Sequence, residues 1–214
     1  MKNIKELPEN IPVFPLSNFI IFPETTVPLN IFEPRYIQMI DDSMKSNRMI
    51  GMIQPKKTGE LKSPELYEIG CMGKVTSFSE TDDGRYLIVL NGISRFKVIE
   101  ELKSDKLYRK CKVDFADFSN DLDSPNEEIK FSDLELIFKD MKNLFQKRGY
   151  MVNWKELQNQ KLDQTINTLA MASPFSLEEK QALLETQNLN LRKEKLQEIL
   201  KIYSADNFSN TTIQ

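Results

Sequence analysis

Two glycines and a lysine in the segment 70–74, GCMGK, suggest a phosphate-binding loop. A Walker A loop needs four residues between its glycines and a serine or threonine after the lysine, because backbone N–H groups wrap the phosphates and the hydroxyl holds magnesium. Here two residues separate the glycines and Val75 follows the lysine. The GXXG formed by Gly70 and Gly73 is also found in RNA-clamping KH domains, but strand-like sequence follows it here. We expect a strand corner that needs small residues.

A second candidate is Ser94, which follows Gly92 and Ile93 as in the first half of a nucleophile elbow. Phe96 occupies the position of the second glycine, and the chain contains no histidine that could activate the serine. The pair Asn91-Gly92 instead predicts a tight turn between strands. Missing histidine also removes the usual general base and the commonest metal ligand. We therefore predict no catalytic residue, no metal site, no bound nucleotide and no cofactor.

Acidic pairs and cysteines complete the candidates for chemistry. Asp41-Asp42 falls on the polar face of a predicted helix and Asp82-Asp83 in a predicted turn, so solvated carboxylates are favoured over a metal site. Cys71 and Cys111 lie in separate strand-like segments and are expected to be buried, reduced thiols.

Composition limits the partners. A net charge of -3 and a pI near 5.3 disfavour nucleic-acid binding through phosphate neutralisation. One basic cluster nevertheless offers an alternative RNA-binding site. Lysines on an edge strand also prevent aggregation between sheets, which is the competing explanation. The cluster consists of Lys103, Lys106, Arg109, Lys110 and Lys112. The longest apolar run, Phe19 to Phe22, is too short to span a bilayer, and the N-terminus lacks the apolar core of a secretory signal. We expect a cytoplasmic protein without membrane contact.

The elements that must position any site fall into two classes. Apolar, proline-broken sequence from Ile11 to Tyr36 predicts short strands, and Pro34 begins an amphipathic helix. Further strands follow to about residue 115, including a hairpin at TDDGR. After the acidic segment 119–128, helical stripes are predicted near 134–145, 154–157, 162–172, 177–185 and 191–203. We therefore predict an α+β chain with a β domain at 8–118, a helical bundle at 125–204 and a disordered tail at 205–214.

Several of these segments resemble a known family. PVFPL, FP, PLNIFEPRY, IGMIQP, LYEIGCMGKVTSF and NGISRFKV occur in the order found in the N-terminal (LON) domain of the ATP-dependent protease Lon, and SPFSLEEKQALLE is similar to its helical part. The match extends from about Ile11 to Tyr203 and is closest to the free-standing LON-domain proteins of bacteria. The resemblance implies a PUA-like β pseudobarrel followed by a helical bundle, and a role in contacting protein substrates. PUA-type barrels also bind RNA in many cases.

Neither the ATPase domain nor the Ser-Lys protease domain of Lon is recognisable in these residues, although the resemblance invites the label of an ATP-dependent Lon-type peptidase. We expect instead a non-catalytic module that binds exposed apolar segments of polypeptides in protein quality control. Methionines are concentrated in the β half, where they can present adaptable apolar surface, although filling of the core is the favoured explanation for them. Taken with the resemblance, the apolar ribbon Phe19 to Phe32 and its neighbouring helix give these candidate polypeptide-binding residues: Phe19, Ile21, Phe22, Phe32, Tyr36, Met39 and Met52.

Overall fold

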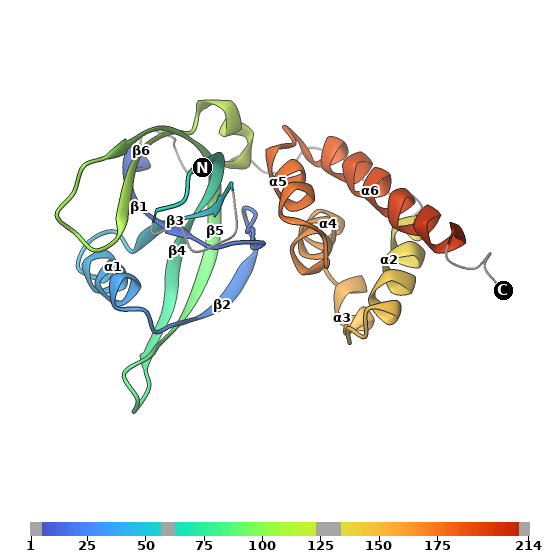
Figure 1. Cartoon of the computed structure of the whole chain (residues 1–214), viewed down its shortest axis with the longest axis horizontal. Helices are drawn as coiled ribbons and strands as arrows, with labels where there is room; N and C mark the ends of the chain where they lie inside the picture. The colour runs from blue at the N-terminus through green and yellow to red at the C-terminus, as the bar shows by residue number, and fades with distance from the viewer. Residues whose placement is uncertain (1–5, 57–62, 123–133, 210–214) are drawn as a thin grey trace. The chain divides into compact units, whose positions relative to one another are not determined.

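The computed structural model describes residues 6–56, 63–122 and 134–209 and divides the chain into two compact units, Met1–Pro125 and Asn126–Gln214. The first unit contains the strands and the second is helical (Figure 1). The mixed α+β class and the β-then-helix order predicted from sequence are confirmed. The strands are β1 (Asn10–Pro15), β2 (Thr26–Ile31), β3 (Met49–Pro55), β4 (Leu66–Glu80), β5 (Tyr86–Leu102) and β6 (Arg109–Asp114).

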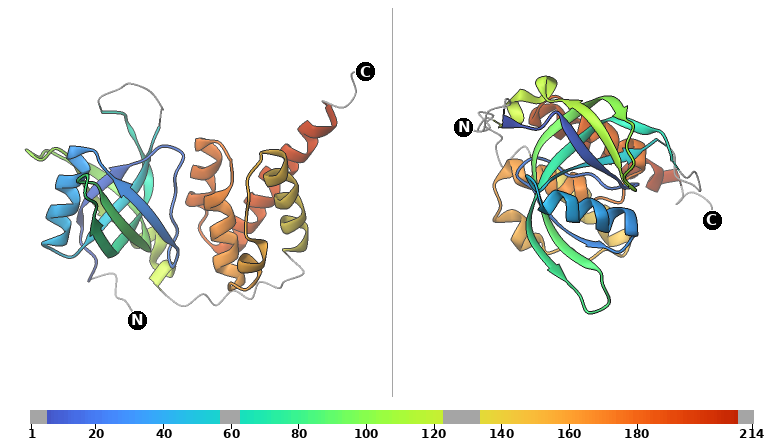
Figure 2. Two further views of the ribbon diagram at one scale, coloured as in Figure 1. Left: turned by 90° about the horizontal axis from the view of Figure 1, so that it is seen from below. Right: turned by 90° about the vertical axis from the view of Figure 1, so that its left-hand side faces the viewer.

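These strands form one sheet in the order β2-β5-β4-β3-β1-β6, closed by an additional pairing between β5 and β6. Closure is possible because β5 is long: residues 86–91 pair with β2, and residues 97–102 pair with β6. Helix α1 (Pro34–Met44) lies across one end of the curled sheet (Figure 2). Pro34 stands at the start of α1, where its missing N–H has no helical partner to lose.

Alternate residues of the strands fill the barrel. One cluster combines residues of β1, β3, β4, β5 and β6 with the segment that follows β6, because side chains of period two from each strand meet inside. Its members are Ile11, Val13, Ile53, Met72, Ile93, Phe96, Cys111, Val113 and Phe115. Both cysteines are free and buried, as expected.

The predicted turn at Asn91-Gly92 is wrong. Both residues lie within β5, where the pairing with β4 shifts between Met72 and Gly73 to leave Ile93 as an extra residue. Gly92 allows the backbone of the Phe22 segment to pack directly against β5, because a Cβ atom at this position would lie 2.0 Å from the carbonyl oxygen of Phe22. The predicted TDDGR hairpin is confirmed: Glu80 pairs with Tyr86, and Gly84 has a φ of 76°.

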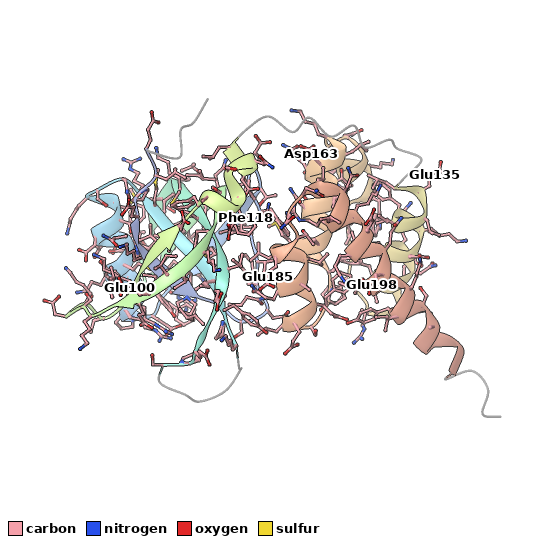
Figure 3. All side chains as sticks on the ribbon, turned by 90° about the horizontal axis from the view of Figure 1, so that it is seen from above. Glu100, Phe118, Glu135, Asp163, Glu185 and Glu198 are labelled. Atoms are coloured by element: carbon pink, nitrogen blue, oxygen red, sulfur yellow. The ribbon has the colours of Figure 1, made fainter. Side chains whose placement is uncertain are left out.

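The end of the β unit is fixed by a buried ion pair. Arg95 of β5 makes two side-chain hydrogen bonds to Asp121, at 2.9 and 2.7 Å, and the guanidinium lies 4.2 Å from the ring centroid of Phe118. Asp121 and Phe118 belong to the 3-10 segment η2 (Ala116–Leu122), on which Figure 3 labels Phe118. This contact attaches η2 to the barrel.

The helical unit contains α2 (Glu135–Lys147), α3 (Trp154–Gln158), α4 (Leu162–Ala172), α5 (Leu177–Glu185) and α6 (Leu189–Ser209). The predicted capping box of Ser176 and Glu179 is present at the start of α5. α6 continues to Ser209, beyond the helix end predicted near Tyr203, so residues 205–209 are helical and the remainder of the predicted tail lies outside the described residues. Trp154 is half-buried. The other apolar side chains predicted for this unit's core are buried: Leu134, Ile137, Phe138, Met141, Leu144, Phe145, Leu169, Leu183, Leu184, Leu196 and Leu200.

Candidate functional site

The residues that suggested chemistry are structural. Gly70 to Lys74 lie within β4 and pair with β3 and β5, so they form extended strand and no loop that could wrap a phosphate. A Cβ atom on Gly70 would lie 2.5 Å from the ring of Phe96, which explains the small residue. Ser94 is fully buried in β5, and its hydroxyl donates to the carbonyl oxygen of Arg95. Across residues 6–56, 63–122 and 134–209, no group of three or more acidic, cysteine or histidine side chains is placed to hold a metal ion.

The acidic pair of α1 has a defined role that sequence reasoning missed. Tyr86 donates to Asp41 Oδ1 at 3.0 Å, and Tyr108 donates to Asp42 Oδ2 at 2.9 Å. Lys106 lies 3.0 Å from the same Oδ2 atom and, together with the Tyr108 hydroxyl, lowers the pKa of Asp42. These bonds tie α1 to β5 and to the β5–β6 connection. Partners so far apart in sequence leave no local signal from which the contact could be predicted.

Most of the predicted polypeptide-binding residues are buried, which corrects their assignment as a docking surface. Five of them are at most 4% exposed and belong to the core of the β unit: Ile21, Phe22, Tyr36, Met39 and Met52. The segment folds inward because burial of its apolar surface is favourable and because its backbone finds partners. Phe22 N–H donates to Thr25 Oγ1, and Thr25 Oγ1 donates to the Phe22 carbonyl. The five buried side chains cannot form a docking surface in this structure. Phe19, the sixth residue of the prediction, is half-buried.

Phe32 is the one candidate from this set that is strongly exposed, at 65%. It follows Ile31, which pairs with Tyr86, so Phe32 continues the register toward Arg85. Phe32, Asp83, Gly84 and Arg85 line a depression of about 470 Å³ at the end of the β4–β5 hairpin. An exposed aromatic ring beside a concave surface is a candidate contact point for an apolar side chain of a partner.

Leu87 extends this apolar surface along the outer face of the sheet. It is 45% exposed and lies directly opposite Asn30 of β2 and Ser79 of β4. Side chains two apart on a strand share a face, so Leu87 and Arg85 of one strand stand beside Asn30 and Phe32 of the other. Sequence alternation in YLIVL could have identified Leu87 as facing away from the core, but its exposure depended on what covers that face. We refer to Phe32, Leu87 and the depression as the outer-face site.

The opposite face of the same hairpin carries an aromatic pair. The rings of Phe78 and Tyr86 meet edge to face with centroids 4.8 Å apart, and Phe78 remains 38% exposed. Figure 1 shows the β4–β5 hairpin extending past the rest of the barrel. Apolar side chains are therefore accessible on both faces of a projecting hairpin.

The alternative RNA-binding residues are interleaved with carboxylates. Lys106 pairs with Asp42, and Arg109 makes two hydrogen bonds to Glu101, which lower the pKa of Glu101. Arg109 Nη1 also donates to the Pro64 carbonyl at 2.7 Å. Such pairing leaves little free positive charge for phosphates.

Of Lys110 and Lys112, only the second has an acidic residue directly opposite it in the β5–β6 ladder. Lys112 stands opposite Glu100 in the β5–β6 ladder, and Lys110 stands opposite Leu102. Figure 3 labels Glu100 on this part of β5. The four residues Lys106, Arg109, Lys110 and Lys112 therefore do not combine into one uncompensated basic surface.

A second depression, of about 390 Å³, lies beside Arg109. Its lining combines Leu66, Tyr67 and Val98 with the carboxylates of Glu65, Glu68 and Glu101. Lys56 contacts Glu65, and Lys97 lies 4.0 Å from Glu68, so its rim charges are balanced by neighbours. This surface offers a weaker case for ligand binding than the outer-face site.

No described helix has the length and apolar character needed to cross a membrane.

Comparison with known proteins gives one family: the model for the ATP-dependent protease La (LON) substrate-binding domain matches residues 10–202. The Lon protease of Dictyoglomus thermophilum is 25% identical over 208 residues, which cover 93% of this chain and 25% of that protein. The Lon protease of Desulfosudis oleivorans is 27% identical over 195 residues, covering 89% of this chain and 24% of that protein. The chain thus spans about a quarter of the length of these curated relatives.

Solved structures share the fold. The Lon N-terminal domain protein from Xanthomonas campestris has a TM-score of 0.61 at 20% identity, covering 87% of this chain and 96% of that one. The N-terminal domain of the Mycobacterium avium complex Lon protease has a TM-score of 0.60 at 16% identity, covering 90% and 98% respectively. At these identities the likeness shows the fold alone.

Proposed function

The chain belongs to the LON substrate-binding domain family, and on this premise we propose that it is a non-catalytic module that binds exposed apolar segments of other polypeptides through the outer-face site. The observation that carries the proposal is the exposure of Phe32 and Leu87 beside one depression, on a sheet whose other large apolar side chains are mostly buried. Both side chains lose water when a partner's apolar residue covers them, which supplies a favourable free energy without any need for charge.

The absence of catalysis is part of the same proposal. Ser94 is buried, the GCMGK segment is strand, and the acidic pair of α1 binds tyrosine hydroxyls. These groups are occupied in holding the fold, so they supply no assembled acid, base or nucleophile. The longer relatives are named as proteases. For this chain we propose a different role, the delivery of bound polypeptide to a protease or chaperone.

The test uses a permanently unfolded protein as the probe, for example reduced and carboxymethylated α-lactalbumin, labelled with a fluorophore. Phe32→Ser combined with Leu87→Thr removes the apolar part of the outer-face site while keeping strand-compatible side chains. We expect this variant to bind about tenfold more weakly, because loss of two exposed apolar anchors costs on the order of 1–2 kcal/mol.

Leu107→Ser is the matched control. Leu107 is 63% exposed on the same unit but lies on the β5–β6 connection, outside the outer-face site. Its loss should leave binding unchanged, and circular dichroism should show all variants folded. Equal binding by the wild type and the double variant would remove the outer-face site from consideration, and equal weakening by Leu107→Ser would indicate non-specific adhesion.

A further inference from the structure

We propose that the free edge of β4 at the projecting hairpin adds a strand from the bound polypeptide, and that it selects an extended segment with an apolar residue two positions from a lysine or arginine. This inference rests on the proposed polypeptide-binding function and names how the partner's backbone is held. It concerns residues Thr76 to Glu80, which are all exposed.

The edge is free because β4 extends beyond the end of its neighbour β3. β3 pairs with β4 only as far as Lys74, and Val75 N–H then donates to the Arg48 carbonyl at 2.8 Å. Beyond Val75, no strand in the described part of the chain pairs with this side of β4. β5 occupies the opposite side as far as Glu80, which pairs with Tyr86.

The hydrogen-bonding pattern of the hairpin shows which backbone groups of β4 point away from β5. Thr81 N–H donates to the Arg85 carbonyl at 2.9 Å, so this pair is hydrogen-bonded within the hairpin. Bonded and non-bonded pairs alternate along an antiparallel ladder, so Ser79 also bonds toward β5. Phe78 and Glu80 therefore direct their N–H and C=O groups away from β5, and an added strand can make up to about four hydrogen bonds with them.

This edge lacks the protection that the other exposed edge carries. β2 ends the sheet on its far side, and Pro28 removes a donor in the middle of that strand. From Thr76 to Glu80 there is no proline and no lysine, the residues that commonly block strand addition. The pairing shift between Val75 and Ser77 lies at the base of the hairpin and leaves the outer part regular.

Side chains along the edge define the partner's chemistry. Phe78 and Glu80 share one face of the hairpin, so a partner strand places two residues of its own, two positions apart, beside them. An apolar residue fits beside the Phe78 ring. A lysine or arginine fits beside Glu80, which has no ion-pair partner among the described residues and lies two positions before Asp82.

The probe is a fluorescein-labelled heptapeptide, Thr-Lys-Thr-Val-Thr-Lys-Thr, which presents the same pattern in either strand direction. Glu80→Pro removes the outward N–H but no donor to β5, so the hairpin should remain folded. We expect Glu80→Pro to weaken binding about tenfold, equivalent to about 1.4 kcal/mol. Glu80→Gln, which removes only the charge, should weaken binding about twofold to threefold.

Two controls separate strand addition from other binding. Thr26→Pro places a proline at an outward position of β2, away from Phe32 and Leu87, and should leave binding unchanged. A peptide N-methylated at its valine keeps every side chain but should lose binding, and hydrogen exchange at the amides of Phe78 and Glu80 should slow only with the unmodified peptide.

The outcomes are distinct. Binding that survives both Glu80→Pro and valine N-methylation but is lost in the Phe32→Ser, Leu87→Thr variant would overturn strand addition while leaving the outer-face proposal intact. Absence of binding by both the unfolded protein and the heptapeptide would overturn both. Concentration-dependent dimerisation abolished by Glu80→Pro, without peptide binding, would assign the edge to a second copy of this chain and overturn the proposed occupant.

Discussion

Tyr108 donates its hydroxyl hydrogen to Asp42 Oδ2 across 66 positions of sequence, at 2.9 Å, and so fastens the β5–β6 connection to α1. A neighbouring bond from Leu107 N–H to Gln38 Oε1, also 2.9 Å long, joins the same two segments. Together with the Tyr86–Asp41 bond, these contacts hold the helix that covers one end of the barrel.

This fastening should be sensitive to alkaline pH. Burial and the hydrogen bond to the Asp42 carboxylate raise the pKa of Tyr108 from its ordinary value of 10.0 to about 12. A raised folded-state pKa means that the bond contributes fully below pH 10 and is lost as pH rises through about 12. Tyr108→Phe should therefore lower the thermal midpoint at pH 7, and the difference from wild type should shrink between pH 10 and 12, as followed by circular dichroism. A difference that stays constant across this range would contradict the assignment.

The buried pair of Arg95 and Asp121 should be costly to break. The two side chains are only 2% and 9% exposed, so Asp121→Ala leaves a desolvated guanidinium without its carboxylate. We expect a loss of about 3–5 kcal/mol in the free energy of unfolding, measured with denaturant. Glu68→Ala breaks the exposed Lys97–Glu68 pair of the same unit and serves as the control, with no measurable change expected. A loss from Asp121→Ala that is no larger than about 1 kcal/mol would contradict this expectation.

Gly92→Ala should destabilise the β unit strongly. The new methyl group would lie 2.0 Å from the Phe22 carbonyl oxygen, so the backbone of the buried segment or of β5 must move. We expect a loss of more than about 3 kcal/mol. At Gly84, where the φ is 76° and no atom lies within 4 Å, alanine meets only backbone strain and should cost about 1–2 kcal/mol. Urea titration of both variants makes the comparison, and a smaller cost at Gly92 than at Gly84 would refute the packing explanation.

Polypeptide binding should depend only modestly on salt. Apolar burial is weakly screened, so affinity for the unfolded probe should change less than about threefold between about 50 and 200 mM salt. Lys110→Gln with Lys112→Gln should leave it unchanged. RNA binding predicts a steep loss over this range and a shallower slope in the lysine variant. A filter-binding titration with single-stranded RNA and a fluorescence titration with the probe distinguish these two partners.

The sequence by itself determined the class and order of the elements. Local rules acted within a few residues: Pro34 begins α1, Ser176 and Glu179 cap α5, and the Asp-Gly turn closes the β4–β5 hairpin. The absence of histidine and of a complete phosphate loop restricted the chemistry as well. Stripes of period 3.6 identified the buried faces of the helices, because one-sided burial leaves a periodic trace in sequence.

Only the tertiary structure decided which apolar residues are accessible. Phe22 and Phe32 belong to the same proline-broken ribbon, yet the first is fully buried and the second is 65% exposed. The difference arises because Gly92, 70 positions away from Phe22, lets β5 approach that segment, whereas Phe32 continues β2 beyond the core. The free edge of β4 likewise depends on where β3 ends, and the roles of Asp41 and Asp42 depend on tyrosines from distant strands. Exposure is set by contacts between segments far apart in the chain, and a local pattern carries no record of them.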